Sequence, residues 1–481
     1  SDQLQQDHYI CDGRIQTLHP LFCWHGFRYF ETEGSCEVLC VEVIHTDVAV
    51  TSSFSCSDPV LNWLYEAYIR TQLDNYHGCV PSDCPHRERL GYTGDGQLTA
   101  ETAMLLLDAK ELYRKWYQDI LDSQGAETGH IPHTAPFLGG GGGPGGWGCA
   151  VYQVPLAWEK IYGDDSLLVQ GYDAILRWFD YMDAHSEKGL VVREEEGGWC
   201  LGDWCFPASE EKEQLPEAFI NTFYYLHGLQ EMMQISEKMN NKLTIRFAER
   251  EKNVKNAFLD AYFDPETGDF CEGRAAGNAY GLALGLGDKR TKKHLVEKYE
   301  ALGRFDTGIF GTSMLLEQLF SIGAGDLAVR LLTNDSEAAS FAHMKRNGAT
   351  TLWERWDGRE SHNHPMFGAC VRLLFTQILG IRMTPSAQPP VVNPAQPDVT
   401  APPAQALKPL NGELQPPAVP GSAQHFSYEI RLSSQRQLTW AKGSIQTPDG
   451  ILSVSWELLE NGEKQVEWSL APAGEDKVPT M

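Results

Sequence analysis

Apolar residues at helical spacing recur along most of this 481-residue chain and restrict it to a mainly helical fold. The first helical segment begins at Asp58-Pro59. About a dozen such segments extend to Arg382, separated by Gly-rich or polar loops. They include residues 98–118, 150–162, 166–184, 216–236, 243–260, 274–286, 292–302, 312–321, 324–333 and 365–379. Consecutive antiparallel pairs bury so many apolar stripes most simply, so we predict a helical domain over residues 51–382.

Strand signals precede the helical region. The runs 21–24, 27–30 and 38–44 are rich in apolar, aromatic or β-branched residues and favour short strands. These strands are too few to form a domain. We therefore predict that residues 1–50 are the C-terminal strands of an N-terminal β-sandwich.

The composition changes again after the helical region. Residues 383–425 are rich in Pro, Ala and Gln and have no apolar period, so we predict a linker. In residues 426–481 apolar and polar side chains alternate, and Asp449-Gly450 marks a hairpin turn. This stretch predicts a small C-terminal β-domain.

The charge excludes two classes of partner. With 65 acidic and 39 basic residues, the chain carries a net charge of −26, which repels nucleic acids and anionic membrane surfaces. It contains no run of about 18 apolar residues that would span a bilayer. A neutral ligand is easiest to reconcile with this charge, and the 13 Trp and 18 Tyr offer flat faces that suit sugar rings.

Cysteine usage bears on the compartment. The 12 Cys are scattered and show no repeated metal-binding spacing. Unpatterned thiols in a large chain favour a reducing compartment, so we predict a cytoplasmic protein, with a periplasmic or secreted one as the alternative. The sequence leaves open whether the chain forms homo-oligomers.

One segment concentrates charged side chains between prolines and glycines. It reads Pro81-Ser82-Asp83-Cys84-Pro85-His86-Arg87-Glu88-Arg89-Leu90-Gly91-Tyr92-Thr93-Gly94-Asp95. The prolines and glycines argue against one continuous helix and predict an ordered loop. Dense mixed charge can keep one acid protonated while its neighbours stay ionised, which is what acid–base catalysis needs. A salt-bridged surface loop is the alternative.

This segment resembles the signature of the bacterial α-L-rhamnosidases of glycoside hydrolase family 78. It departs from that signature at His86, where the family has Gln, and at Tyr92, where the family has Trp. The resemblance implies an (α/α)6 toroid as the catalytic domain and an inverting exo-glycosidase that releases terminal α-L-rhamnose. It covers residues 45–382 well and the two β ends thinly.

Two glutamates match the catalytic pair of this family. Glu88 lies where the family has its general acid, and Glu354 lies in Trp353-Glu354-Arg355-Trp356, where the family has its general base. An inverting hydrolase needs these two carboxyls about 6.5–9.5 Å apart, with room for a water. A fold that closes on itself would bring such distant positions together. A structural salt bridge is the alternative reading for Glu354.

The resemblance also assigns residues to the sugar site. Those expected to hold the sugar are Asp83, Arg87, Tyr92, Asp95, Trp147, Trp204, Trp353 and His364. Structural roles compete with these assignments: helix cap for Asp95, turn former for Asp83, core packing for Trp147 and Trp204, and structural bonding for His364.

The residues predict no metal or organic cofactor. His362 and His364 lie two apart but lack further zinc ligands at suitable spacing. The Gly-rich run 139–148 lacks the Gly-Lys-Ser/Thr ending of a phosphate loop. Cys149 stands where the family often has Asp, so a difference in sugar preference would arise there.

Two other functions stay open. Tyr92 and Cys149 allow a glycosidase of the same scaffold that acts on a different sugar. A sugar-binding protein without catalysis is the third hypothesis, although the intact glutamate pair argues against it. All three have a carbohydrate as the partner.

Overall fold

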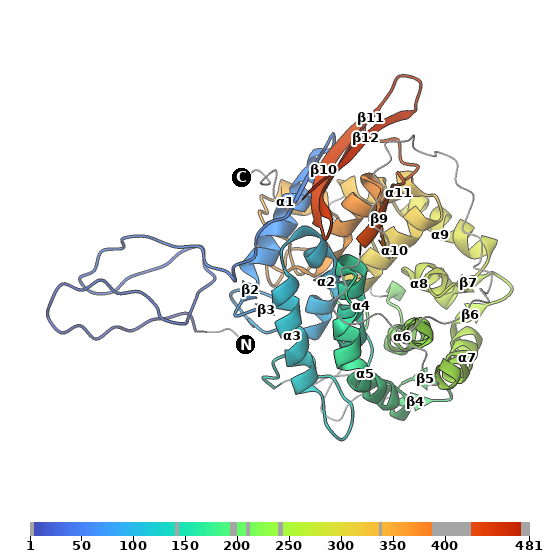
Figure 1. The fold of residues 1–481 in the computed structure, drawn as a ribbon, viewed down its shortest axis with the longest axis horizontal. Coiled ribbons are helices and arrows are strands. Elements are labelled where there is room, and N and C mark those ends of the chain that lie inside the picture. Colours follow the sequence, from blue (N-terminus) through green and yellow to red (C-terminus); the bar gives the residue numbers. More distant parts are fainter. Residues whose placement is uncertain are drawn as a thin grey trace.

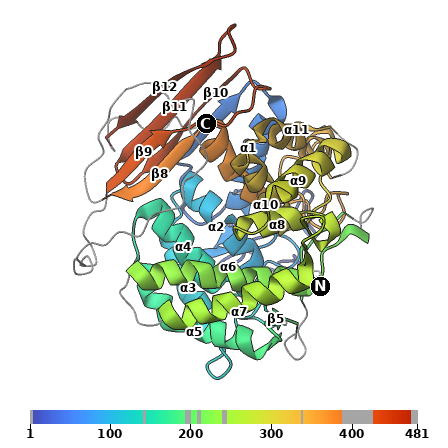
Figure 2. The ribbon, with the colours of Figure 1, turned by 90° about the vertical axis from the view of Figure 1, so that its right-hand side faces the viewer.

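The structure is a computed structural model of the chain, and it describes residues 4–139, 144–192, 200–207, 212–238, 244–335, 339–386 and 425–472. Most of these residues form a helical body, and the C-terminal strands lie along one side of it (Figures 1 and 2). None of the described helices is both long enough and apolar enough to cross a membrane.

Twelve α-helices are described in the helical body. They are α1 (Pro59–Asp74), α2 (Thr93–Leu106), α3 (Lys110–Ser123), α4 (Ala150–Tyr162), α5 (Ser166–Ala184), α6 (Glu217–Lys238), α7 (Thr244–Tyr262), α8 (Gly277–Ala283), α9 (Lys289–Leu302), α10 (Ile309–Ser321), α11 (Gly325–Thr333) and α12 (Phe341–Arg346). A 3-10 turn, η3 (Met366–Val371), and a π turn, η4 (Leu374–Ile378), follow them. The predicted mainly helical class is confirmed.

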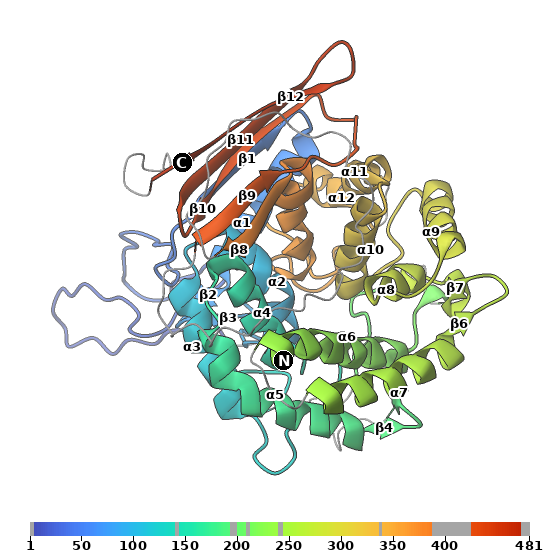
Figure 3. The ribbon, with the colours of Figure 1, turned by 45° about the vertical axis from the view of Figure 1, so that its right-hand side comes forward.

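The helices pair along the chain and form an inner and an outer layer. α4 packs on α5, α6 on α7, α8 on α9 and α10 on α11, while α2 contacts α4 and η3, and α10 contacts α8 and η3. Figure 3 shows α3, α5, α7 and α9 on the outside. The inner helix α2 is buried along nearly its whole length, whereas α3 buries one stripe that includes Leu112, Trp116 and Ile120. That difference is expected when one layer encloses another.

Local signals explain most of the helix limits. The predicted helices 150–162 and 166–184 coincide with α4 and α5, and Gly163 ends α4 in a left-handed conformation, with φ of 64°. The Asp58 carboxylate accepts the Val60 and Leu61 N–H groups and caps α1. These ends depend on neighbouring residues alone, so the sequence predicts them well.

Two helix predictions are wrong. The predicted helix 98–118 is divided into α2 and α3, because Leu107 is extended and forms a bridge with Val50. The predicted helix 365–379 contains the turns η3 and η4 instead of an α-helix. The backbone there approaches α1 so closely that a Cβ on Gly368 would lie 2.1 Å from the Tyr68 ring.

The C-terminal strands form a sheet together with an early strand. Its order is β1 (Ser52–Cys56), β10 (Trp440–Thr447), β11 (Gly450–Leu458) and β12 (Lys464–Ala471), all antiparallel. A separate pair joins β8 (Ile381–Ser386) to β9 (His425–Ile430). Leu452, Val454 and Trp456 alternate with less buried residues and face the helical body, and the Trp456 indole donates to the Ile378 carbonyl at 2.8 Å.

These strands cross the predicted domain limits. β1 belongs to the C-terminal sheet although it lies within residues 51–382, and β8 spans the limit at residue 382. Most of the predicted linker 383–425 lies outside the described residues. A strand is defined by its partner, and neither partnership is visible in local composition.

The strands predicted at 21–24, 27–30 and 38–44 are not present in the structure. Residues 4–49 have no assigned strand, and Figure 1 shows them as extended loops that project from the helical body. Leu21, Phe22 and Val43 are exposed there. β-branched composition favours a pleated, half-buried surface. The loops touch the described residues Tyr76 and His77, where the Thr46 N–H donates to the Tyr76 carbonyl at 2.6 Å, but none of the three predicted runs pairs with a described strand in a hydrogen-bond ladder.

Short two-stranded hairpins connect several of the helices. They are β2 (Tyr76–His77) with β3 (Val80–Pro81), β4 (Ser186–Glu187) with β5 (Leu190–Val191), and β6 (Phe263–Asp264) with β7 (Asp269–Phe270). β3 ends at Pro81, which is the first residue of the charged segment.

Candidate active site

The charged segment is an ordered loop that closes on itself between β3 and α2. The Asp83 N–H donates to the Leu90 carbonyl at 3.0 Å, and the Leu90 N–H donates to Asp83 Oδ1 at 3.0 Å. Thr93 to Asp95 form the first turn of α2, so the predicted loop is confirmed only up to Tyr92. The helix therefore fixes the direction of Asp95, while the loop carries Asp83, Arg87 and Glu88.

Arg87 brings the two candidate glutamates together. Its Nη2 lies 2.7 Å from Glu354 Oε2 and 3.6 Å from Glu88 Oε1, and its Nη1 donates to Glu360 Oε2 at 2.7 Å. Two oxygens at these distances from one nitrogen are at most about 6.3 Å apart. The fold thus gathers positions that are distant in the sequence.

The two glutamates lie in different surroundings. Glu354 is 4% exposed, and its Oε2 accepts hydrogen bonds from Arg87 and from the Ser361 N–H at 3.0 Å. These charge-assisted bonds fix the position of the Glu354 carboxylate. The Glu88 side chain is 29% exposed and lies beside Tyr92, where burial first and the charge of Glu88 second raise the pKa of the phenol.

His364 lies between the carboxylates of Asp95 and Glu354. Its Nε2 is 3.1 Å from Asp95 Oδ1, and its Nδ1 is 3.7 Å from Glu354 Oε2. Burial opposes a charged imidazole, but hydrogen bonds with Asp95 and Cys84 and the charges of Asp95 and Glu354 raise the pKa of His364 well above its ordinary value. The imidazole is therefore buried between two carboxyl groups.

Asp83 and Cys84 lie next to His364. Burial chiefly raises the pKa of Asp83 well above its ordinary value, so this carboxyl can carry a proton. Burial alone would raise the pKa of the Cys84 thiol, but the hydrogen bond and the charge of His364 outweigh it and lower that pKa to about 6. Burial also raises the pKa of Asp95, against the effect of His364. The site thus holds both donors and acceptors for hydroxyl groups.

The aromatic candidates surround the site at different depths. Trp147 is buried against His133 and Phe310, with ring centroids 5.6 and 5.3 Å away. Gly94 packs against it so tightly that a Cβ would lie 2.4 Å from the indole.

Trp204 and Trp353 are positioned by neighbouring side chains. The Arg355 guanidinium lies 5.1 Å from the ring centroid of Trp204, which is partly exposed. Trp353 is buried and stacks on His362 at 4.5 Å, so it supports the Glu354 segment.

Sequence reasoning missed several supporting residues. Glu360 and Ser361 hold Arg87 and Glu354, but neither lies in a quoted motif. Asp203 accepts the N–H groups of Gly308, Phe310 and Gly311 at 2.8–3.0 Å and so caps α10, a role that its place before Trp204 does not suggest. Cys149 is buried and donates to the Gly146 carbonyl at 3.3 Å.

The comparison with known families identifies the fold. Residues 49–378 match the bacterial alpha-L-rhamnosidase 6 hairpin glycosidase domain, and residues 1–50 match the bacterial alpha-L-rhamnosidase concanavalin-like domain. The chain belongs to this family. The helix pairs described above are thus hairpins of a six-hairpin toroid, as the sequence resemblance implied.

Individual relatives agree with the family. An alpha-L-rhamnosidase of Streptomyces avermitilis is 30% identical over 404 residues, which is 78% of this chain and 37% of the relative. An alpha-L-rhamnosidase of Alteromonas sp. is 26% identical over 94% of this chain and 48% of its own length. The chain thus spans less than half the length of these rhamnosidases.

Solved rhamnosidase structures have the same fold. The S. avermitilis alpha-L-rhamnosidase complexed with L-rhamnose superposes with a TM-score of 0.71 at 25% identity, over 86% of this chain and 37% of that one. The alpha-L-rhamnosidase of Aspergillus terreus gives 0.74 at 22% identity, over 89% and 48%.

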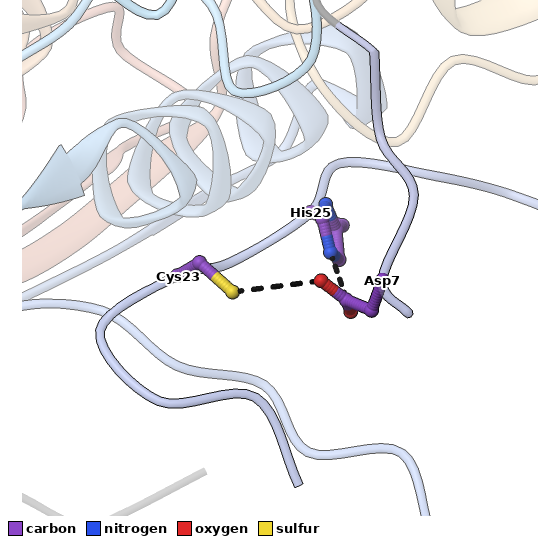
Figure 4. A group of neighbouring side chains, drawn as sticks. All are labelled: Asp7, Cys23 and His25. Carbon is purple, nitrogen blue, oxygen red and sulfur yellow. Dashed lines mark hydrogen bonds and ion pairs between the residues drawn. The ribbon is translucent and has the colours of Figure 1, made fainter. Parts of the chain in front are cut away.

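Two groups of side chains in the described residues could hold a metal ion. One is Asp83, Cys84 and His364 at the candidate site, and the other is Asp7, Cys23 and His25 in the N-terminal loops (Figure 4). A separate cavity of 440 Å³ in the helical body is lined by Gln97, Glu101, Glu317 and Arg372, among others. Neither candidate glutamate lines that cavity.

Proposed function

We propose that this chain carries the catalytic site of an inverting exo-glycosidase that releases terminal α-L-rhamnose from rhamnosides. The observation that carries this proposal is the meeting of Glu88 and Glu354 at the Arg87 guanidinium. Membership of the rhamnosidase family and the alpha-L-rhamnosidases among the relatives support rhamnose as the sugar.

The surroundings of the two glutamates suit different catalytic roles. Glu354 is buried and held in place by Arg87 and Ser361, which suits a base that takes a proton from a positioned water. Glu88 is more exposed, which suits the acid that protonates the departing glycosidic oxygen, because the leaving group must exit towards solvent.

The spacing of the carboxyls gives Arg87 a part in the reaction. Their nearest oxygens are at most about 6.3 Å apart, which is less than the 6.5–9.5 Å of inverting enzymes. Arg87 lies between them, so a sugar and a water fit only if its side chain moves away from Glu88. Its bonds to Glu354 and Glu360, both 2.7 Å, are shorter than its 3.6 Å contact with Glu88, so that contact breaks most easily.

The buried groups around His364 supply the hydrogen bonds that a sugar needs. Asp83 and Asp95 offer carboxyl oxygens, and the raised pKa values of these acids allow a carboxyl to donate as well as accept. Tyr92, Trp147 and Trp204 provide aromatic surface for the apolar face of the ring. All of these groups come from α2, the loop before it and two further loops.

Hydrolysis of p-nitrophenyl α-L-rhamnoside tests the proposal. Glu88→Gln and Glu354→Gln should each remove nearly all turnover, because each change removes a proton-transfer group. An NMR spectrum recorded early in the reaction should show the inverted anomer of rhamnose. Substantial activity in either variant would contradict the assigned roles, and a retained anomer would contradict inversion.

Two further measurements separate the alternatives. A panel of aryl glycosides with a clear preference for a sugar other than rhamnose would favour another glycosidase on this scaffold. Calorimetric binding of rhamnose without any turnover would favour a binding protein.

We also propose a reducing compartment, such as the cytoplasm, because all twelve cysteines are free thiols in the structure. Four of them, Cys11, Cys23, Cys36 and Cys40, are exposed. Fractionation of cells that produce the protein tests this location.

A further inference from the structure

Three metal-binding groups meet beneath the candidate active site. An oxygen of Asp83, the sulfur of Cys84 and a ring nitrogen of His364 all lie within 4.8 Å of one another, and Cys84 Sγ is 3.0 Å from Asp83 Oδ2. Tetrahedral zinc ligands at about 2.0–2.3 Å from the ion are about 3.3–3.8 Å apart. Small side-chain shifts would therefore enclose an ion.

The surroundings of this group distinguish it from a chance cluster. Asp83, Cys84 and His364 are 1%, 0% and 4% exposed. Nδ1 of His364 has no well-aligned hydrogen-bond partner in the described part of the chain. A set of one sulfur, one nitrogen and one oxygen matches Zn²⁺ and similar ions rather than Mg²⁺ or Ca²⁺, which prefer oxygen alone.

We propose that Asp83, Cys84 and His364 form a binding site for a thiophilic divalent cation such as Zn²⁺, and that the bound ion inhibits the enzyme. The ion competes with the sugar, because Asp83 and His364 are also the groups that hold the sugar. Coordination needs a thiolate and a neutral imidazole, so any protons that these two groups carry pass to solvent. The inhibition rests on the proposed function, whereas the metal site does not.

The second group, Asp7, Cys23 and His25, serves as an internal comparison. It offers the same three donor types, with His25 Nε2 at 2.9 Å and Cys23 Sγ at 3.8 Å from the Asp7 carboxylate (Figure 4). Asp7 and Cys23 are exposed, and the group lies in the N-terminal loops. It shares no residue with the group of Asp83, Cys84 and His364.

Cobalt absorption tests the metal site without any substrate. Co²⁺ bound to a thiolate gives a charge-transfer band in the near ultraviolet, so we expect such a band with the wild-type chain and with Cys23→Ser. Cys84→Ser should lose the band while its circular dichroism stays that of the wild type. A band that persists in Cys84→Ser, or one that disappears in Cys23→Ser, would overturn the assignment. L-rhamnose should weaken the band of the wild-type chain, and an unchanged band at saturating rhamnose would refute the competition.

Zinc titration of p-nitrophenyl α-L-rhamnoside hydrolysis tests the inhibition. We expect Zn²⁺ to raise the apparent KM and EDTA to reverse the effect. Loss of a ligand should raise the zinc concentration for half inhibition at least about 10–100-fold in Cys84→Ser, with no change in Cys23→Ser. Equal inhibition of both variants would refute the proposal. A cobalt band at Cys84 in a chain without rhamnosidase activity would instead reject the proposed function and retain the metal site.

Discussion

Replacement of Gly94 by alanine should disturb the candidate site through Trp147. Gly94 lies in the first turn of α2, next to Asp95, and a Cβ there would lie 2.4 Å from Cε2, 2.5 Å from Nε1 and 2.7 Å from Cδ2 of the buried Trp147 ring. A rigid indole cannot absorb such an overlap by turning a flexible end. Either the ring or the start of the helix must therefore move.

The expected magnitude follows from two opposing effects. Overpacking of a filled core costs about 1–3 kcal/mol, while alanine in place of glycine in a helix gains up to about 1 kcal/mol. We therefore expect Gly94→Ala to lower the free energy of unfolding by about 0–2 kcal/mol. Because Asp95 is the next residue, a displacement of about 1 Å should lower kcat/KM by roughly 10²-fold.

Urea unfolding and hydrolysis of an aryl rhamnoside measure the two effects. Gly325→Ala is the matched control, since it also lies at the start of a helix, where a Cβ would meet its nearest atoms at 3.3–3.5 Å. Trp147→Phe in the Gly94→Ala background should recover part of the lost stability, because the smaller ring makes room for the methyl group. Wild-type activity and stability in Gly94→Ala would refute the reasoning.

Arg87 and Asp203 offer two further tests. Arg87→Met should lower kcat/KM by about 10–100-fold, since its hydrogen bond with Glu354 joins charged groups and such a bond contributes about 1.5–3 kcal/mol. The control Arg359→Met, which removes an exposed ion pair with Asp357, should leave kcat/KM unchanged. Equal kcat/KM values for the two variants would contradict a role for Arg87. Burial raises the pKa of Asp203 from 3.8 to about 6, so the folded state binds this proton more tightly and the free energy of unfolding should fall as the pH rises between these values. In Asp203→Asn that part of the pH dependence, measured by urea unfolding, should disappear; an unchanged slope would assign it to other groups.

The sequence predicted those parts of the fold that depend on near neighbours. α4 and α5 have the expected limits because Gly163 and the following acidic residues separate them. The break at Leu107 was missed because it depends on Val50, and the place of β1 was missed because its partner β10 lies at the other end of the chain. Strand signals near the N-terminus failed for the same reason, since strands need partners that local composition does not reveal.

The sequence predicted the candidate site as two separate motifs, one around Glu88 and one around Glu354. The structure shows which side chains bring these motifs into contact. Arg87 was expected to bind sugar, and no local pattern shows that it also joins Glu354 to Glu360. The grouping of Asp83, Cys84 and His364 could not be predicted from the sequence either, because His364 is distant from the other two residues along the chain. The roles of the individual sugar-binding residues stay predictions.

The early strand β1 has a consequence for any attempt to shorten the protein. It immediately precedes the first helix, yet it completes a sheet whose other members follow the last one. The sheet thus joins the segment before the first helix of the toroid to the segment after its last helix. A truncation that removed the C-terminal strands would leave β1 with an unpaired edge that other chains could pair with, so the helical domain and the C-terminal sheet have to be produced together.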